Sequence, residues 1–170
     1  MLVKTPRCGR FGKSSYERMA CYTARMMPLF PLHPRLVHFP IALLVTGSVL
    51  ALAYMLRWRR PALATTTWLL ILLGWISVFF AVLTGLIDRN NAPQDPEIAS
   101  LISVHTALGF ALIAVYGLML YERLRSPEAL DSPSMRWRLV ALAALGLALV
   151  LIDGWVGGTL VYKHGVGVLG

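Results

Sequence analysis

Histidine and aspartate side chains are the groups in this 170-residue sequence that can bind a cofactor or transfer protons. The positions of interest are His33, His38, His105, His164, Asp88 and Asp153. An imidazole can ligate a metal ion or haem iron and titrates near neutral pH, and a carboxylate can orient an imidazole through its second ring nitrogen. Which of these chemistries is available depends on the elements that bring the side chains together.

The composition indicates that lipid surrounds most of the chain. Hydrophobic residues make up 57% of the sequence and charged residues only 14%, whereas a soluble domain carries roughly 25% charged residues. The net charge of +8 comes from basic residues that flank apolar runs, which is typical of membrane topology, so we expect no nucleic-acid partner. Both cysteines, Cys8 and Cys21, precede these runs, and the predicted core therefore does not depend on a disulfide.

Four apolar runs are long enough to cross a membrane as helices, since about 20 residues span a hydrocarbon core of about 30 Å. The predicted spans are residues 36–56, 66–87, 98–121 and 139–162. Short connections between them favour antiparallel neighbours. The sequence therefore predicts an all-α fold, an integral membrane four-helix transmembrane bundle with up-down topology, over residues 27–170. We expect residues 1–26 to be a basic tail that is disordered or results from a misassigned start site.

The distribution of positive charge predicts the orientation of this bundle. The connections after the first and third spans carry Arg57, Arg59, Arg60, Arg123, Arg125, Arg136 and Arg138, whereas the opposite end carries Arg35, Arg89 and Lys163. Because positively charged loops stay cytoplasmic, we expect both termini to be extracytoplasmic. The basic residues of the tail argue for the reverse orientation, a conflict that disappears if the chain begins near Met27.

The predicted topology brings all four histidines to the end of the bundle that holds the termini. His33 and His38 precede or begin the first span, His105 lies about two turns inside the third, and His164 follows the fourth. Asp88 closes the second span at the same end, and Asp153 lies about two turns inside the fourth. Ionisable groups within a bilayer are costly and usually face a partner inside the bundle. We therefore expect a site near the extracytoplasmic face.

A b-type haem is the first kind of site that this placement permits, because histidines from facing helices can supply two axial imidazoles. We expect His105 to be the deep ligand and His38 its partner, with His164 as the next choice. Asp153 would support an imidazole, and Gly109 would leave room for the macrocycle.

Two other kinds of site use the same groups. A non-haem metal ion could add His33 and Asp88 as alternate ligands, and a proton or quinone relay could use a histidine–aspartate pair. A purely structural interpretation is also open. His33 and His38 can be interfacial residues, His105 and Asp153 can form a structural pair, and glycines 154 and 158 form a small-x-x-x-small pattern that favours close helix packing.

Four motifs together resemble those of a known family. They are His-Pro-x-x-Val-His-Phe-Pro-Ile-Ala-Leu at 33–43, Gly85-x-x-Asp88, His105-x-x-x-Gly109, and Gly157-Gly158-x-Leu-Val-Tyr-x-His-Gly-Val-Gly-Val at 157–168. They resemble the small bacterial membrane proteins grouped as domain of unknown function 2231, over about residues 27–170. The resemblance implies four transmembrane helices and no established activity. It also implies occasional association with cytochrome c or Rieske-type domains, which suggests a redox role. Asp153 is not assigned to the family pattern.

These observations lead to two functional hypotheses. The first is a multi-pass redox protein of the bacterial inner membrane that binds haem b through His38 and His105 and passes electrons from quinol or another donor to a periplasmic cytochrome or similar acceptor. The second is a non-catalytic accessory or scaffold subunit of a larger membrane complex, without a cofactor, in which the polar cluster fixes helix register. No catalytic residue is assigned, and we expect an electron-transfer or accessory protein rather than a stand-alone enzyme.

Overall fold

The structure is a computed structural model, and it describes residues 32–89, 95–125 and 132–167. The helices of this part, in chain order, are α2 (Leu32–Leu36), α3 (His38–Leu56), α4 (Pro61–Asp88), α5 (Pro96–Arg125) and α6 (Pro133–Tyr162). The described residues contain no strand. The predicted basic tail, residues 1–26, lies outside the described residues.

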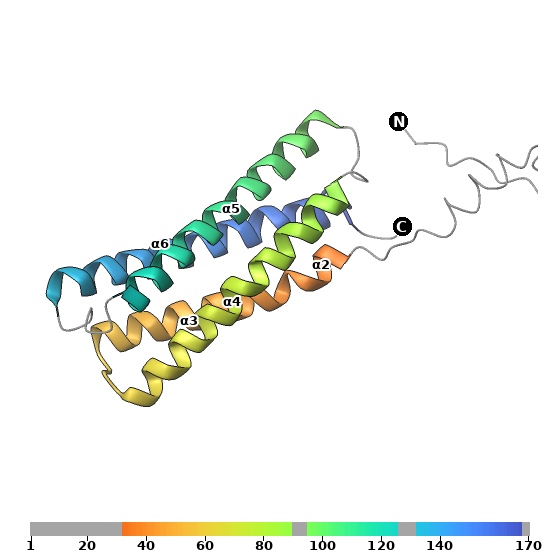
Figure 1. The fold of residues 1–170 in the computed structure, drawn as a ribbon. Helices are drawn as coiled ribbons and strands as arrows, with labels where there is room; N and C mark the ends of the chain where they lie inside the picture. The colour runs from red at the N-terminus through yellow and green to blue at the C-terminus, as the bar shows by residue number, and fades with distance from the viewer. Residues whose placement is uncertain (1–31, 90–94, 126–131, 168–170) are drawn as a thin grey trace, which may run out of the picture. The chain divides into compact units, whose positions relative to one another are not determined.

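The four long helices form a closed antiparallel bundle (Figure 1). Each helix from α3 to α5 packs against the next one in the chain, and α6 returns to pack against α3. The helical segments His33–Leu56, Pro61–Asp88, Pro96–Arg125 and Pro133–Tyr162 are each long and apolar enough to cross a membrane. The predicted all-α bundle with four transmembrane helices is therefore confirmed.

Three of the long helices begin earlier than the apolar runs predicted, and each begins at a proline. These residues are Pro61, Pro96 and Pro133. A proline is tolerated in the first turn because the N–H that it lacks would have no partner inside the helix. At α5 the preceding Asp95 caps the helix, since its Oδ1 accepts hydrogen bonds from the backbone N–H groups of Glu97 (2.9 Å) and Ile98 (3.3 Å).

The first span also begins earlier than residue 36, because the short helix α2 precedes α3. The two helices are separated only at Val37, whose N–H donates to the carbonyl of His33 (3.1 Å). Pro40 cannot donate the hydrogen bond that would join the two segments across this point. Helical structure therefore continues back past the predicted start and includes His33 in the span.

The middle of the bundle is centred on Tyr116 of α5, which is completely buried. Its hydroxyl lies 2.7 Å from the Oγ atom of Ser48 on α3. On α6, a Cβ atom at Gly146 would lie only 2.7 Å from the Tyr116 ring, so this glycine is needed for close packing. The outer surface, by contrast, exposes large apolar side chains such as Phe80 and Trp155, which is expected where lipid replaces water.

Candidate functional site

The start of α2, the end of α4 and the start of α5 lie at the same end of the bundle (Figure 1). Four ionisable residues from four helices come together near this end. We call them the histidine network: His33 of α2, Asp88 of α4, His105 of α5 and Asp153 of α6. The Nε2 atoms of His33 and His105 are 3.4 Å apart, and Nδ1 of His105 is 2.6 Å from Oδ1 of Asp153. The backbone N–H of His33 donates to Oδ2 of Asp88 at 3.3 Å.

The partners of His33 determine which of its ring nitrogens carries hydrogen. Its Nδ1 lies 2.8 Å from the carbonyl oxygen of Ala81 on α4. A carbonyl oxygen can only accept, so Nδ1 is the donor of this hydrogen bond. In the neutral ring, Nε2 then carries a lone pair rather than a hydrogen, and this lone pair is available to a ligand.

The same reasoning applies to His105 on the other side of the bundle. Its Nδ1 lies 2.6 Å from Oδ1 of Asp153, and both side chains are largely shielded, at 21% and 16% relative exposure. A carboxylate at this distance favours the hydrogen on Nδ1, because a carboxylate oxygen can only accept. Nε2 of the neutral His105 ring therefore also carries a lone pair. It faces Nε2 of His33, with the ring centroids 5.7 Å apart and the ring planes at 71°.

Two lone pairs at this separation repel one another unless a cation lies between them. A proton on one ring or a metal ion bound by both nitrogens would provide that cation. Ligating histidines commonly donate their other ring N–H to a carbonyl or a carboxylate. Here the carbonyl of Ala81 accepts from His33, and the carboxylate of Asp153 lies 2.6 Å from Nδ1 of His105.

Two glycines lie directly behind the two rings. A Cβ atom at Gly85 of α4 would lie 3.0 Å from Cε1 of His33, and one at Gly157 of α6 would lie 3.1 Å from Cε1 of His105. The bare backbone at these positions lets each ring pack against a helix other than its own. The motif at 157–158 contained this signal, but the sequence did not show which of its glycines contacts a histidine.

The sequence predictions for the two N-terminal histidines differ from their observed positions. The sequence favoured His38 as the partner of His105 and treated His33 as an alternate near the rim. In the structure His33 faces His105, whereas the side chain of His38 is exposed at the start of α3. The reason is the early start of the first span, which extends helical structure back through His33.

His164 lies outside the network but near its end of the bundle. It follows α6, and its Nε2 is 3.9 Å from Oε1 of Glu97 at the start of α5. Nζ of Lys163 is 3.7 Å from the same oxygen. This grouping links the ends of two helices and does not place His164 opposite His105.

The predicted roles of the glycines also change. Gly109 is buried, and a Cβ atom there would lie 3.0 Å from a methyl group of Val82, so the space beside it is occupied by α4. It permits close packing of α4 and α5 and does not leave room for a macrocycle. Nothing lies within 4 Å of a Cβ atom at Gly158, and Gly154 makes only an ordinary contact with Ile41.

The donor set for a metal ion is a pair of imidazoles rather than a complete ligand cage. Within residues 32–89, 95–125 and 132–167, no group of three or more histidine, cysteine, aspartate or glutamate side chains is arranged to hold a metal ion. The alternate ligand Asp88 uses its carboxylate to hold the backbone of His33. The arrangement can thus share a proton or supply two axial nitrogens.

The fold and the site define a helical-bundle membrane protein with an imidazole pair near one end. Residues 29–170 match the model of a family described as "Predicted membrane protein (DUF2231)", and the chain belongs to this family. The match agrees with the family resemblance of the sequence motifs. No curated protein and no solved structure matches the chain.

Proposed function

We propose that this protein is a membrane redox protein in which His33 and His105 bind the iron of a b-type haem. On the orientation predicted from the arginines, it passes electrons near the extracytoplasmic face, from quinol or another donor to a periplasmic acceptor. The observation that carries this proposal is that the Nε2 atoms of two histidines from different helices face each other, 3.4 Å apart.

The donor set fits an iron with two axial imidazoles. Two metal–nitrogen bonds of about 2 Å each require a separation of about 4 Å, which is close to the observed 3.4 Å between the two nitrogens. The helices that carry the two rings would also have to part to admit the macrocycle, because the bundle is closely packed beside them. Haem would supply one-electron chemistry at this position, and its axial ligands would help to set its potential. Gly109 is not part of the proposed site, because Val82 already fills the space beside it.

The neighbouring residues would act on the two ligands. The carbonyl of Ala81 and the carboxylate of Asp153 hold the Nδ1–H groups, and this leaves both Nε2 atoms available. The carboxylate also makes the His105 imidazole more basic and so a stronger ligand. Asp88 would act on His33 only indirectly, since its carboxylate accepts a hydrogen bond from the backbone N–H of His33 and so fixes the start of α2.

An optical spectrum of the purified protein tests this proposal. After expression with added haem precursor, we expect a Soret band and the sharp α band of a low-spin, reduced b-type cytochrome. His105→Ala should abolish the low-spin spectrum, whereas His164→Ala should keep it, since His164 contacts Glu97 instead of the imidazole pair. A wild-type protein that is folded and monodisperse but shows no Soret band would refute haem binding.

A proton relay is the second candidate, and the 3.4 Å separation of the two Nε2 atoms favours it. At this distance one proton can be shared by the rings, and the Asp153–His105–His33 contacts then form a continuous path for a proton. Such a path could serve quinone chemistry in a partner subunit. Nitrogen-15 NMR of labelled histidine distinguishes the proton relay from the haem site. A relay predicts a protein without haem in which His33 and His105 share one imidazolium proton.

A further inference from the structure

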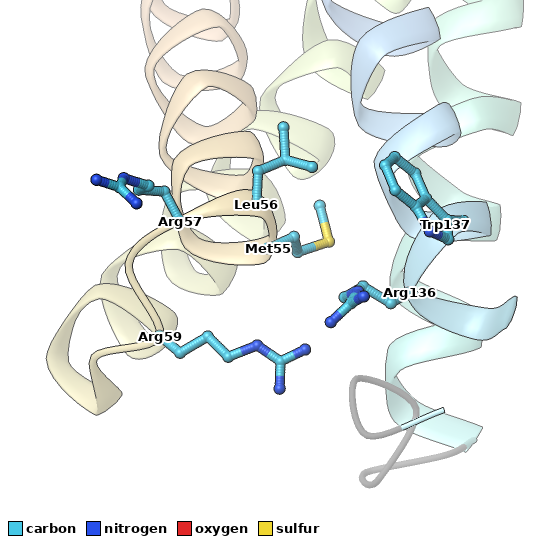
Figure 2. A pocket seen from close by; sticks show the side chains of 6 residues that line it. All are labelled: Met55, Leu56, Arg57, Arg59, Arg136 and Trp137. Atoms are coloured by element: carbon cyan, nitrogen blue, oxygen red, sulfur yellow. The ribbon is translucent and has the colours of Figure 1, made fainter. Parts of the chain in front are cut away.

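The opposite end of the bundle contains an open cleft between the end of α3 and the start of α6 (Figure 2). Its volume is about 270 Å³. We call it the arginine cleft, and the residues that line it are Met55, Leu56, Arg57, Arg59, Arg136 and Trp137. Three of these six residues are cationic, and no acidic residue is among them.

Two of the arginines approach the cleft from different sides. Figure 2 shows the side chains of Arg59, just after α3, and Arg136, in the first turn of α6, extending into the gap between the two helices. Arg57 points to the other side of α3, while the Met55 side chain also enters the gap. Guanidinium groups on both sides of a gap create a positive potential inside it, which favours an anion between them.

The position of the cleft along the helices indicates the source of such an anion. The apolar span of α3 ends at Leu56, and the exposed Trp58 and Trp137 lie beside this end. Tryptophan and arginine are enriched where the hydrocarbon core meets the lipid headgroups. The cleft therefore lies at the depth of the phosphates, with the apolar side chains of Met55 and Leu56 on its membrane side.

We propose that the arginine cleft binds the phosphate of an anionic phospholipid such as phosphatidylglycerol. Arg59 and Arg136 hold the phosphate oxygens, because the planar guanidinium group can donate two parallel hydrogen bonds to a phosphate. The exposed side chain of Leu56 contacts the beginning of an acyl chain. This site does not depend on the haem proposal, since it lies at the other end of the bundle.

A thermal-shift titration of the detergent-solubilised protein tests the site. The probes are phosphatidylglycerol and phosphatidylcholine in mixed micelles, and glycerol phosphate in solution. We expect phosphatidylglycerol to raise the unfolding temperature more than phosphatidylcholine does. The double variant Arg59→Gln/Arg136→Gln should weaken the apparent phosphatidylglycerol affinity by at least about tenfold, because it removes the charge-assisted hydrogen bonds of two guanidinium groups to the phosphate.

The matched control is Arg60→Gln/Arg125→Gln, which removes the same charge from the same end but outside the cleft. We expect it to change the affinity by less than about twofold. Equal weakening by both double variants would overturn the proposal in favour of a diffuse surface charge. An equal shift with glycerol phosphate would assign the cleft to a soluble phosphate compound. The unfolding temperature of each variant in phosphatidylcholine shows whether it is folded.

Discussion

The two ends of this bundle use ionisable residues in different ways. At one end, the histidine network directs two imidazoles toward each other and fixes each of them through its second ring nitrogen. At the other end, the charged side chains of the described residues form simple pairs or line the arginine cleft. Arg138 pairs with Glu122, and Arg123 lies 5.7 Å from the centre of the Trp68 ring. The first arrangement brings imidazole rings together between helices, and the second places charges where the apolar spans end.

The Glu122–Arg138 pair shows why the second arrangement is structural. The Glu122 side chain is 10% exposed and that of Arg138 is 60% exposed. Arg138 brings its charge to a buried carboxylate while much of the side chain stays near the headgroups. The two charges of this pair thereby satisfy each other. The following variants are expected to affect one end of the bundle without affecting the other.

Asp153→Asn is expected to have the largest effect of these variants, and this effect should be confined to haem affinity. It removes the carboxylate that holds the Nδ1–H of His105, so haem affinity should fall by about 10–100-fold, the usual range for an outer partner of a metal ligand. Haem titration of the apoprotein measures this change. Asp88→Asn is the matched control, because Asp88 binds the His33 backbone rather than a ring. An equal loss in both variants would contradict a specific role for Asp153.

Arg138→Ala is expected to affect stability and not the spectrum. It leaves the carboxylate of Glu122 buried without its charge partner, so the free energy of unfolding should fall by about 1–3 kcal/mol, less than for a fully buried pair because Arg138 is partly exposed. Unfolding by SDS from mixed micelles measures this change. Adding Glu122→Gln to Arg138→Ala should restore part of the lost free energy of unfolding. If Arg138→Ala instead altered the haem spectrum, the two ends would not be independent.

Gly85→Ala should have a smaller effect on the histidine network. The added methyl group would lie 3.0 Å from the His33 ring, which must shift by a few tenths of an ångström. We expect haem affinity to fall by less than about tenfold and the Soret maximum to shift. Gly154→Ala makes the same change inside a helix but meets only Ile41 at 3.9 Å, and it should leave the spectrum unaltered. Identical spectra for both variants would contradict the packing of His33 against Gly85.

The transmembrane fold could be predicted from the sequence because it depends on properties that are local in the chain. Each span is a long apolar run in which Asp153 is the one acidic residue of all four, and charged connections mark where the runs end. The predicted helix starts fall too late because the apolar runs begin only after Pro61, Pro96 and Pro133, where the helices start. A proline that follows a basic or acidic connection and precedes an apolar run is the signal that would have placed them.

The candidate site could be predicted only in part, because contacts between helices depend on which side each helix presents. The depth of His105 and Asp153 in their spans allowed them to be paired, and the structure brings them to 2.6 Å. The choice between His33 and His38 could not be made from depth alone. This choice depends on the helix interruption at Val37 and on the orientations of α2 and α3, which lie on either side of it. Because all sides of these helices are apolar, the sequence carries no periodic signal that would fix this orientation.

The most direct test of the proposed imidazole pair is the haem content of His33→Ala compared with His38→Ala. Both variants remove one histidine near the start of the first span, and only His33 faces His105. The measurement is the Soret absorbance per protein after purification under identical conditions. We predict that His33→Ala loses the low-spin spectrum and that His38→Ala retains that of the wild type. If His38→Ala lost the low-spin haem spectrum and His33→Ala retained it, the result would contradict the proposed site.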